Sequence, residues 1–255
     1  MKTVIGLDIG GTKISGIIWD GKKVLDSLDI VTPKNLFEFR RNVLKLADFL
    51  SAKAKPSAVG IGMAGLVDSK HGLVKLSPNI KFVKNLDLPK LFRANGYKNI
   101  KIDNDANCFA RAEMLLGKGR NYNNFLALTL GTGIGGGIVI GRKLYRGENN
   151  LGGELGRIAI KNNFLETDYK KLRDKKDYVG AGRLFGKAFA AYVDIFDPQA
   201  IIIGGSYGHN ESKKYLPTAK MEIKKHLFNK TNNTKIIISQ LKNAGSLGAA
   251  LLIKE

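Results

Sequence analysis

The sequence predicts an α/β protein built from two lobes of the same topology. Residues 4–25 and 126–145 each read as an apolar strand, a turn of glycine and threonine, a second strand and a hairpin. After each copy, helical and strand patterns alternate in the same coarse order. Self-similarity at about half the chain length favours two homologous lobes over a solenoid, whose repeats are shorter.

The elements expected in the first lobe, residues 1–118, follow from the spacing of apolar residues. One stripe recurs in steps of three and four, as in an amphipathic helix over 35–54; its members are Leu36, Phe39, Val43, Leu46 and Leu50. The rest of the lobe is expected to form a strand at 58–63, a hairpin through 68–72, a short helix near Pro89, a strand at 99–102 and a helix over 106–116.

The second lobe, residues 119–255, is expected to end with the same alternation. The expected elements are a helix over 181–196, a strand at 200–205, a helix over 211–228, a strand at 235–239 and a last helix from Gly245 that can pack back onto the first lobe. Residues 161–177 are charged and poor in large apolar side chains, which predicts an exposed loop.

Composition narrows the class of protein. Apolar residues make up 44% and charged residues 25%, which is ordinary for a globular chain. No apolar run approaches the roughly 18 residues of a membrane span, and Asp8 interrupts the stretch where a signal peptide would be apolar. The single cysteine, Cys108, forms no intramolecular disulfide or cysteine cluster for zinc and is expected in the core. A cytoplasmic enzyme that does not bind membranes fits best.

The formal charge of +20, from 42 Lys and Arg against 22 Asp and Glu, raises the question of an anionic partner. The basic residues are scattered, mostly as pairs without aromatic residues between them, which favours a solvated surface. An acidic small substrate or polyphosphate is the next alternative, and nucleic acid is the least favoured.

The glycine-rich turns are the first candidate binding features. Gly131, Gly133 and Gly136 match the spacing of a dinucleotide-binding fingerprint, but that fingerprint must open a helix and here a strand follows. Without a bulky side chain, the backbone N–H groups of such a turn can approach phosphate oxygens. Either turn alone would more simply be a bulged hairpin, whereas two copies in duplicated lobes would face each other across a cleft.

Carboxylates near these turns are the candidates for chemistry. Asp8 ends a predicted buried strand beside the Gly10-Gly11-Thr12-Lys13 turn, where Mg²⁺ would compensate its charge next to phosphates. Asp103 and Asp105 lie at a junction of strand and helix, where one is expected to cap the helix. A hydroxyl acceptor also needs a general base, which is the alternative role for this pair. Asn79 and Glu154, at turns, could hold sugar hydroxyls.

Seven motifs together resemble the ROK family of sugar kinases and sugar-responsive repressors, within the actin-like, hexokinase-like ATPase fold of ribonuclease H-like lobes. They appear in family order and span nearly the whole chain: DIGGTK at 8–13, GMAGLVD at 62–68, SPNI at 77–80, DNDAN at 103–107, GTGIGGG at 131–137, GGELG at 152–156 and IIIGG at 201–205.

The resemblance implies an ATP- and Mg²⁺-dependent kinase that phosphorylates a hexose, with glucose and its 6-hydroxyl expected first. Asp105 falls on the family's catalytic base. The implied nucleotide- and metal-binding residues are Asp8, Gly10, Gly11, Thr12, Lys13, Gly131, Thr132, Gly133, Gly135, Gly204 and Gly205. The implied sugar-binding residues are Gly65, Asn79, Asn104, Asp105, Glu154, Arg157 and Glu166.

The sequence departs from the family at its zinc site. Arg157 replaces the histidine of GELGH, the cysteine-rich loop is missing, and only Leu165-Glu166-Thr167 resembles its end. We therefore expect no zinc, and a forked ion pair of Arg157 with Glu166 first or Glu154 second. An N-acetylhexosamine kinase, a polyphosphate-using hexokinase and a non-catalytic sugar sensor are the alternatives. The repressors carry a DNA-binding domain before a motif that here begins at Asp8, so a kinase, expected as a homodimer, is favoured.

Overall fold

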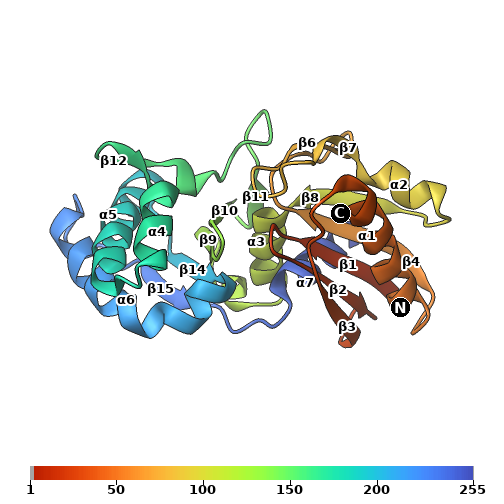
Figure 1. The fold of residues 1–255 in the computed structure, drawn as a ribbon. Coiled ribbons are helices and arrows are strands. Elements are labelled where there is room, and N and C mark those ends of the chain that lie inside the picture. The colour runs from red at the N-terminus through yellow and green to blue at the C-terminus, as the bar shows by residue number, and fades with distance from the viewer. Residues whose placement is uncertain (1–2, 255) are drawn as a thin grey trace. The chain divides into compact units, whose positions relative to one another are not determined.

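The computed structural model describes residues 3–254, and none of its helices is long and apolar enough to cross a membrane in this range. The chain divides into two compact units (Figure 1). Unit 1 comprises Met1–Ala112, Arg146–Gly152 and Leu241–Glu255, and unit 2 comprises Glu113–Tyr145 and Gly153–Gln240. The chain therefore passes from one unit to the other four times, and the last helix, α7 (Ala244–Leu251), is part of unit 1.

Unit 1 is built on a five-stranded sheet with the order β3-β2-β1-β4-β8. The first three strands are antiparallel to their neighbours, whereas β4 and β8 run parallel to β1. Their bounds are β1 Thr3–Ile9, β2 Lys13–Trp19, β3 Val24–Val31, β4 Pro56–Met63 and β8 Ile100–Asn104. The carboxyl ends of β1, β4 and β8 consequently meet at one edge, the usual place for a ligand site in such a sheet.

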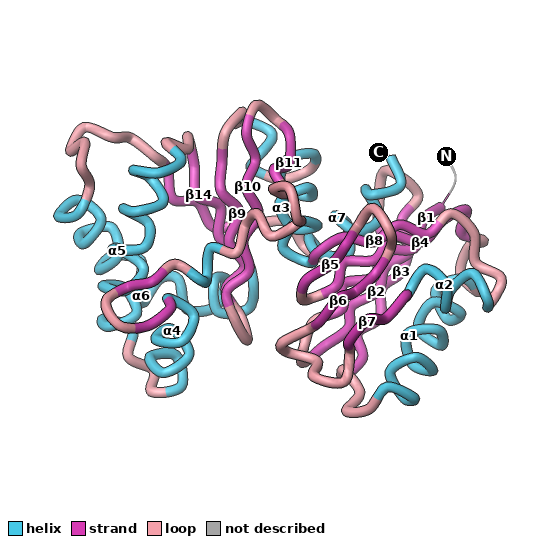
Figure 2. The backbone as a smooth tube through the Cα atoms, turned by 90° about the horizontal axis from the view of Figure 1, so that it is seen from above, coloured by secondary structure: helices cyan, strands magenta, loops and turns pink. Residues whose placement is uncertain are grey.

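Helices cover both faces of this sheet (Figure 2). Asn35 caps α1 (Leu36–Ser51), whose predicted apolar stripe is confirmed as buried from Phe39 onward. On the opposite face, α7 comes so close that a Cβ on Gly6 would lie 2.0 Å from the carbonyl oxygen of Ser246. Gly60 has the same relation to Ala249, at 1.8 Å, so these glycines are what allow α7 to dock.

The rest of unit 1 contains a second, smaller sheet and three helical segments. A small antiparallel sheet contains β5 (Leu66–Asp68), β6 (Leu73–Leu76) and β7 (Lys84–Asp87), of which β7 was not predicted. It leads into the short helix α2 (Leu88–Ala94), and β8 leads into α3 (Asp105–Leu115), which ends in unit 2. The 3₁₀ turn η3 (Leu252–Lys254) follows α7.

Unit 2 repeats the topology, with the sheet order β11-β10-β9-β14-β15. Three antiparallel strands are again followed by two parallel ones, so the predicted duplication is confirmed. The bounds are β9 Phe125–Leu130, β10 Ile134–Ile140, β11 Lys143–Tyr145, β14 Ala200–Gly204 and β15 Lys235–Ile238. Short connections are η1 (Lys118–Asn121), η2 (Leu155–Arg157), β12 (Ala159–Ile160) and β13 (Asn163–Phe164).

The helices of unit 2 are α4 (Leu165–Asp174), α5 (Tyr178–Phe196) and α6 (Gly205–His226). The expectation of a loop over 161–177 is wrong, because α4 occupies most of it. Two apolar residues four positions apart, Leu165 and Tyr169, are enough to anchor this helix in the core of the unit, while its charged residues face outward or bind neighbouring backbone.

Candidate functional site

The β1–β2 turn of unit 1 brings together two of the predicted motifs. Thr32 fastens the turn from outside, because its hydroxyl donates to the Gly10 carbonyl at 2.7 Å and its N–H donates to the Thr12 carbonyl at 3.1 Å. A Cβ on Gly11 would lie only 2.7 Å from the Cβ of Asn79. Gly11 therefore allows the loop that carries Asn79 to lie directly against the turn.

Asp8 ends β1 beside this turn and is electrostatically perturbed. Burial, and then the nearby Asp105 carboxylate, raise the pKa of Asp8 to about 7, against a smaller opposing effect of Lys13. The carboxylate packs against the start of α7, where a Cβ on Gly245 would lie 2.1 Å from Oδ2 of Asp8. Because burial and mutual repulsion disfavour the charged form of Asp8 beside Asp105, a cation bound here would stabilise both carboxylates.

The residues fit Mg²⁺ as a shared ligand of protein and phosphate. No group of three or more His, Cys, Asp or Glu side chains within residues 3–254 could enclose a metal ion. An ion at Asp8 would thus depend on oxygens of water and substrate phosphates for most of its coordination, which is how Mg²⁺ is usually held in kinases.

The β8–α3 junction holds the predicted base. Oδ1 of Asn104 accepts from the N–H groups of Ala106 and Asn107 at 2.8 and 3.1 Å, so Asn104 is the main cap of α3, where an aspartate was expected. Nδ2 of Asn104 donates to the carbonyl of Gly65 at 2.9 Å, which joins two predicted sugar-binding positions. Asp105, at the first turn of α3, accepts from the Ala106 N–H at 3.0 Å and is only partly buried.

Asp103 has a structural role, and the sequence pattern did not indicate its arginine partners. The residue is 2% exposed, and its Oδ2 accepts from both Nε and Nη2 of Arg146, at 3.1 and 2.8 Å. Arg111, also buried, lies 3.6 Å from the same oxygen. An arginine within the apolar face of α3 was the available signal for such a pair, because a buried guanidinium needs a carboxylate.

The second glycine turn, between β9 and β10 in unit 2, is held by side chains of α4. Glu166, Tyr169 and Arg173 share one face of that helix at steps of three and four. Tyr169 donates to the Gly131 carbonyl at 2.7 Å, and Nη1 of Arg173 donates to the carbonyls of Gly131 and Thr132 at 2.9 and 2.8 Å. The Ile134 N–H donates to Glu166 at 3.0 Å.

The start of α6 lies at the same turn. Gly205 has φ +82°, and a Cβ there would lie 2.4 Å from the Leu130 carbonyl oxygen, so only glycine suits this position. Leu130 directly precedes Gly131, and Ser206 Oγ would lie 3.5 Å from a Cβ on Gly131. The N-terminus of this long helix adds favourable electrostatics for a phosphate beside the turn.

The expected fork between Arg157 and a carboxylate is wrong. The Arg157 guanidinium lies 3.9 Å from the ring centre of Phe164, and within the described residues it makes no ion pair with Glu154 or Glu166. Glu166 is instead paired with Lys170, one turn further along α4, and with the Ile134 N–H. Burial, and then Glu166, raise the pKa of Glu154, while Arg157 lowers it, so the three charges still influence one another.

The predicted site residues thus form one set in each unit. The set in unit 1 contains Asp8, Gly10, Gly11, Thr12, Lys13, Gly65, Asn79, Asn104 and Asp105. The set in unit 2 contains Gly131, Thr132, Gly133, Gly135, Glu154, Arg157, Glu166, Gly204 and Gly205.

The fold and these two turns define a two-lobed protein of the actin-like ATPase fold. In agreement, the chain superimposes with a TM-score of 0.86 on a ROK family glucokinase from Streptomyces griseus solved with glucose and AMPPNP, at 25% identity over 98% of both chains. Residues 4–169 and 175–255 match the ROK family, and the chain belongs to that family.

Two further relatives bear on substrate and donor. A glucokinase from Thermotoga maritima is 28% identical over 99% of this chain and 97% of its own length. The crystal structure of an inorganic polyphosphate/ATP-glucomannokinase from Arthrobacter sp. strain KM has a TM-score of 0.82 and 29% identity, over 100% of this chain and 99% of that one.

Proposed function

We propose that this protein is an ATP-dependent sugar kinase that transfers the γ-phosphoryl group to a hexose hydroxyl, with the 6-hydroxyl of glucose as the expected acceptor. The observation that carries the proposal is the pair of neighbouring carboxylates, Asp8 beside one glycine turn and Asp105 at the start of α3. One supplies a place for a cation next to phosphates, and the other supplies a base for a hydroxyl. The similarity to glucokinases over the full chain supports the choice of acceptor.

In the proposed reaction the acceptor oxygen attacks the γ-phosphorus. The bond between the γ-phosphorus and the β,γ-bridging oxygen breaks, and ADP leaves. The hydroxyl proton passes to the Asp105 carboxylate. This carboxylate is held at the start of α3, because the Ala106 N–H donates to both Asn104 and Asp105. Asn104, Asn79 and Gly65 of unit 1 would orient the sugar, and Glu154 and Glu166 stay predicted sugar-binding residues. Positioning and electrostatics supply most of the acceleration in such a transfer.

Each glycine turn is proposed as a phosphate-binding element of its own unit. Asp8 would hold Mg²⁺, which neutralises charge on the transferred phosphoryl group. In unit 2, the carbonyls of Gly131 and Thr132 are bound by Tyr169 and Arg173, so the turn is presented in a fixed conformation to the phosphates. Gly204 and Gly205, at the end of β14, would lie on the adenosine side.

Polyphosphate is a second candidate donor. The high positive charge and the likeness to a kinase that uses polyphosphate and ATP both favour testing it. ADP is released only when ATP is the donor, so the sugar 6-phosphate formed must be measured for both donors. Equal rates with equal molar concentrations of ATP and polyphosphate chains would show that the protein uses both donors. Transfer from ATP alone would exclude polyphosphate.

A panel of acceptors tests the function itself. Purified protein with Mg-ATP should release ADP in the presence of glucose faster than with mannose, N-acetylglucosamine, N-acetylmannosamine or no sugar. Fastest turnover with an N-acetylhexosamine would change the substrate and keep the reaction. Sugar binding without any turnover would favour a sensor. A cytoplasmic location and a homodimer are further proposals, the latter tested by sedimentation at several protein concentrations.

A further inference from the structure

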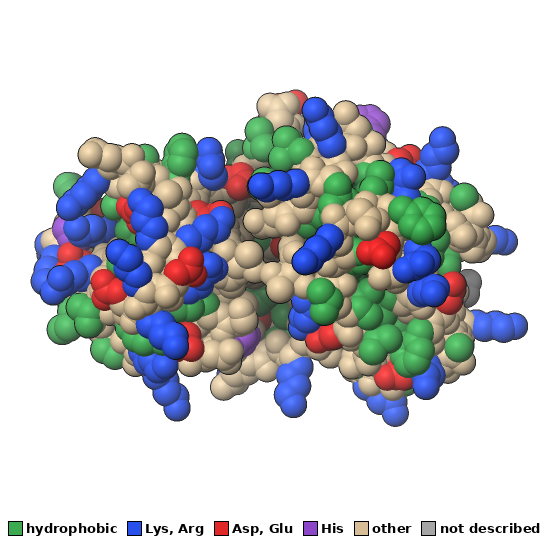
Figure 3. All heavy atoms as spheres, viewed as in Figure 1, with side chains coloured by type: hydrophobic (Ala, Val, Ile, Leu, Met, Phe, Trp, Pro, Cys, Tyr) green, Lys and Arg blue, Asp and Glu red, His purple; other side chains and the backbone are tan. Residues whose placement is uncertain are grey.

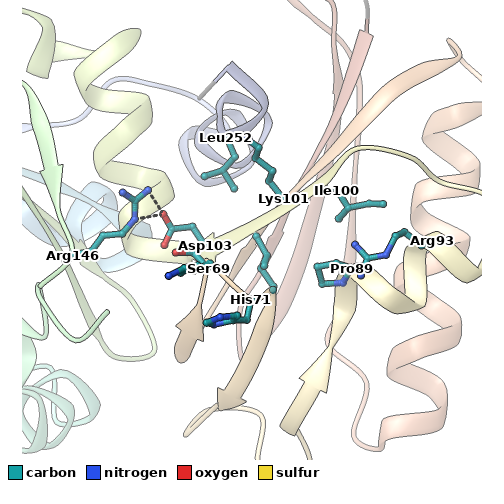
Figure 4. A pocket seen from close by; sticks show the side chains of 12 residues that line it. Ser69, His71, Pro89, Arg93, Ile100, Lys101, Asp103, Arg146 and Leu252 are labelled. Carbon is teal, nitrogen blue, oxygen red and sulfur yellow. Dashed lines mark hydrogen bonds and ion pairs between the residues drawn. The ribbon is translucent and has the colours of Figure 1, made fainter. Parts of the chain in front are cut away.

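A pocket separate from the predicted site residues runs along β8, the edge strand of the sheet in unit 1. Its volume is about 460 Å³, and its walls are the β5–β6 turn, α2, β8 and the side chain of Arg146 (Figure 4). None of the residues implied in sugar or nucleotide binding lines it. Its volume lies within the range of small-molecule sites.

The charge of this pocket is unbalanced. Four cationic side chains, Lys70, Arg93, Lys101 and Arg146, line it together with a single carboxylate, Asp103, which Arg146 and Arg111 already neutralise. Neither Lys70 nor Lys101 forms an ion pair with any described residue, and Arg93 has only a long contact of 3.9 Å with Asp87. On the face drawn in Figure 3, Lys and Arg side chains are spread over the surface.

The pocket also has an apolar wall. Pro89, Ile102 and Leu252 are buried, and Ile100 is half-buried beside them. In Figure 4, Arg146 and Asp103 lie on one side of the open space, with Arg93 and Pro89 on the other and Leu252 at its margin. Cations would pair with an anionic group, while the apolar wall would cover the carbon skeleton that bears it.

We propose that this pocket binds a small phosphorylated metabolite, a phosphomonoester with a carbon skeleton of sugar size. The site goes beyond the proposed kinase function, because it shares no residue with the proposed catalytic or nucleotide-binding groups. Arg146 connects it to Asp103, whose neighbours in the chain are Asn104 and Asp105, so a bound phosphate would compete for the guanidinium that holds the β8–α3 junction.

Calorimetric titration with ribose 5-phosphate tests the proposal, in the presence of Mg-AMPPNP and glucose to occupy the proposed catalytic site. Neutral ribose and inorganic pyrophosphate are the comparison ligands. The pocket variant combines Arg93→Ala with Lys101→Ala. The matched control combines Lys22→Ala with Arg40→Ala, which removes the same charge from exposed positions of unit 1 outside the pocket. Thermal unfolding shows whether both variants are folded. If the pocket variant is unfolded, Lys70→Ala takes its place.

We expect ribose 5-phosphate to bind the parent protein and the control alike, and the pocket variant about 10-fold or more weakly, the effect of losing charge-assisted hydrogen bonds. Ribose should not bind. Equal affinity in the pocket and control variants, or no binding to the parent at about 10 mM ligand, would overturn the site. Binding of pyrophosphate without ribose 5-phosphate would overturn the ligand class. A failure of the kinase proposal is seen separately, as absence of ADP release by the parent protein.

Discussion

The two glycine turns share a sequence pattern and a topology but lie in different surroundings. Two residues before the first glycine, unit 1 has Asp8, with a pKa of about 7, whereas unit 2 has the uncharged Thr129 at the corresponding position. In the first turn, Thr32 holds the carbonyls of Gly10 and Thr12 and Asp29 pairs with Lys13, whereas three side chains of α4 hold the second turn. In the proposed function, the first turn therefore serves metal binding and acid–base chemistry, and the second serves phosphate binding.

The largest expected effect is that of Asp105→Asn on kcat, with the KM for ATP unchanged. Asp105→Asn removes the proposed base and should lower kcat by about 10²-fold or more, the scale of general-base contributions. The KM for ATP should stay close to that of the parent, since the second turn is untouched. Asp26→Asn, at a half-buried aspartate of β3 outside the predicted site, is the control. Turnover of Asp105→Asn close to the parent's would assign Asp105 to helix capping.

Asp8→Asn tests the metal role of the first turn. Without the carboxylate, we expect the Mg²⁺ concentration for half-maximal activity to rise about 10-fold, as one charged ligand is lost. Thr129→Val, at the corresponding position of unit 2, should leave the Mg²⁺ requirement unchanged. A similar change in both variants would mean that the two turns do not differ in metal binding.

Arg173→Ala loosens the second turn. Loss of its hydrogen bonds to the Gly131 and Thr132 carbonyls should raise the KM for ATP about 5-fold, equivalent to roughly 1 kcal/mol, with little change in the KM for sugar. Arg173→Lys should recover part of the loss. The control is Arg183→Ala, an exposed arginine on α5. An unchanged KM for ATP would show that α4 does not hold the nucleotide turn.

Stability should depend on pH through Asp8. Its pKa is raised from 3.8 to about 7, so the folded protein keeps a proton that the unfolded chain releases, and stability falls as pH rises through that window. Above it, the parent should be less stable than Asp8→Asn by on the order of 1 kcal/mol, allowing for partial solvent access. Urea unfolding of both proteins at about pH 4 and pH 8 measures the difference. A difference independent of pH would contradict the assigned pKa.

The smallest expected effect is that of a zinc chelator on unit 2. Glu166 is held by Lys170 and the Ile134 N–H, so we expect no stoichiometric zinc and no loss of sugar affinity after treatment with a zinc chelator. Metal analysis and sugar titration before and after treatment provide the test. One zinc per chain, with sugar binding lost on its removal, would show that a metal orders this region.

The sequence predicted features that depend on local or repeated patterns. The stripe of α1, the duplicated strand order and the glycine turns all have such patterns, and all are present. Helix α4 was missed because only Leu165 and Tyr169 mark its buried face, among otherwise polar residues.

Contacts distant in sequence could not be predicted. Arg146 and Asp103 are 43 residues apart, and nothing near either residue specifies the partner. Arg157 was expected to pair with a carboxylate because it replaces the family's histidine. In the structure, Glu166 pairs with Lys170 one helical turn away, and Arg157 lies on an aromatic ring. Motif positions indicated candidate residues, whereas packing determined which groups each one contacts.

The division of labour between the turns is tested most directly by nucleotide binding without turnover. Calorimetric titration of Mg-AMPPNP into the parent, Asp105→Asn and Arg173→Ala proteins measures affinity separately from chemistry. We predict parent-like affinity for Asp105→Asn and about 5-fold weaker binding for Arg173→Ala. Weakened binding in Asp105→Asn with unchanged binding in Arg173→Ala would contradict the account.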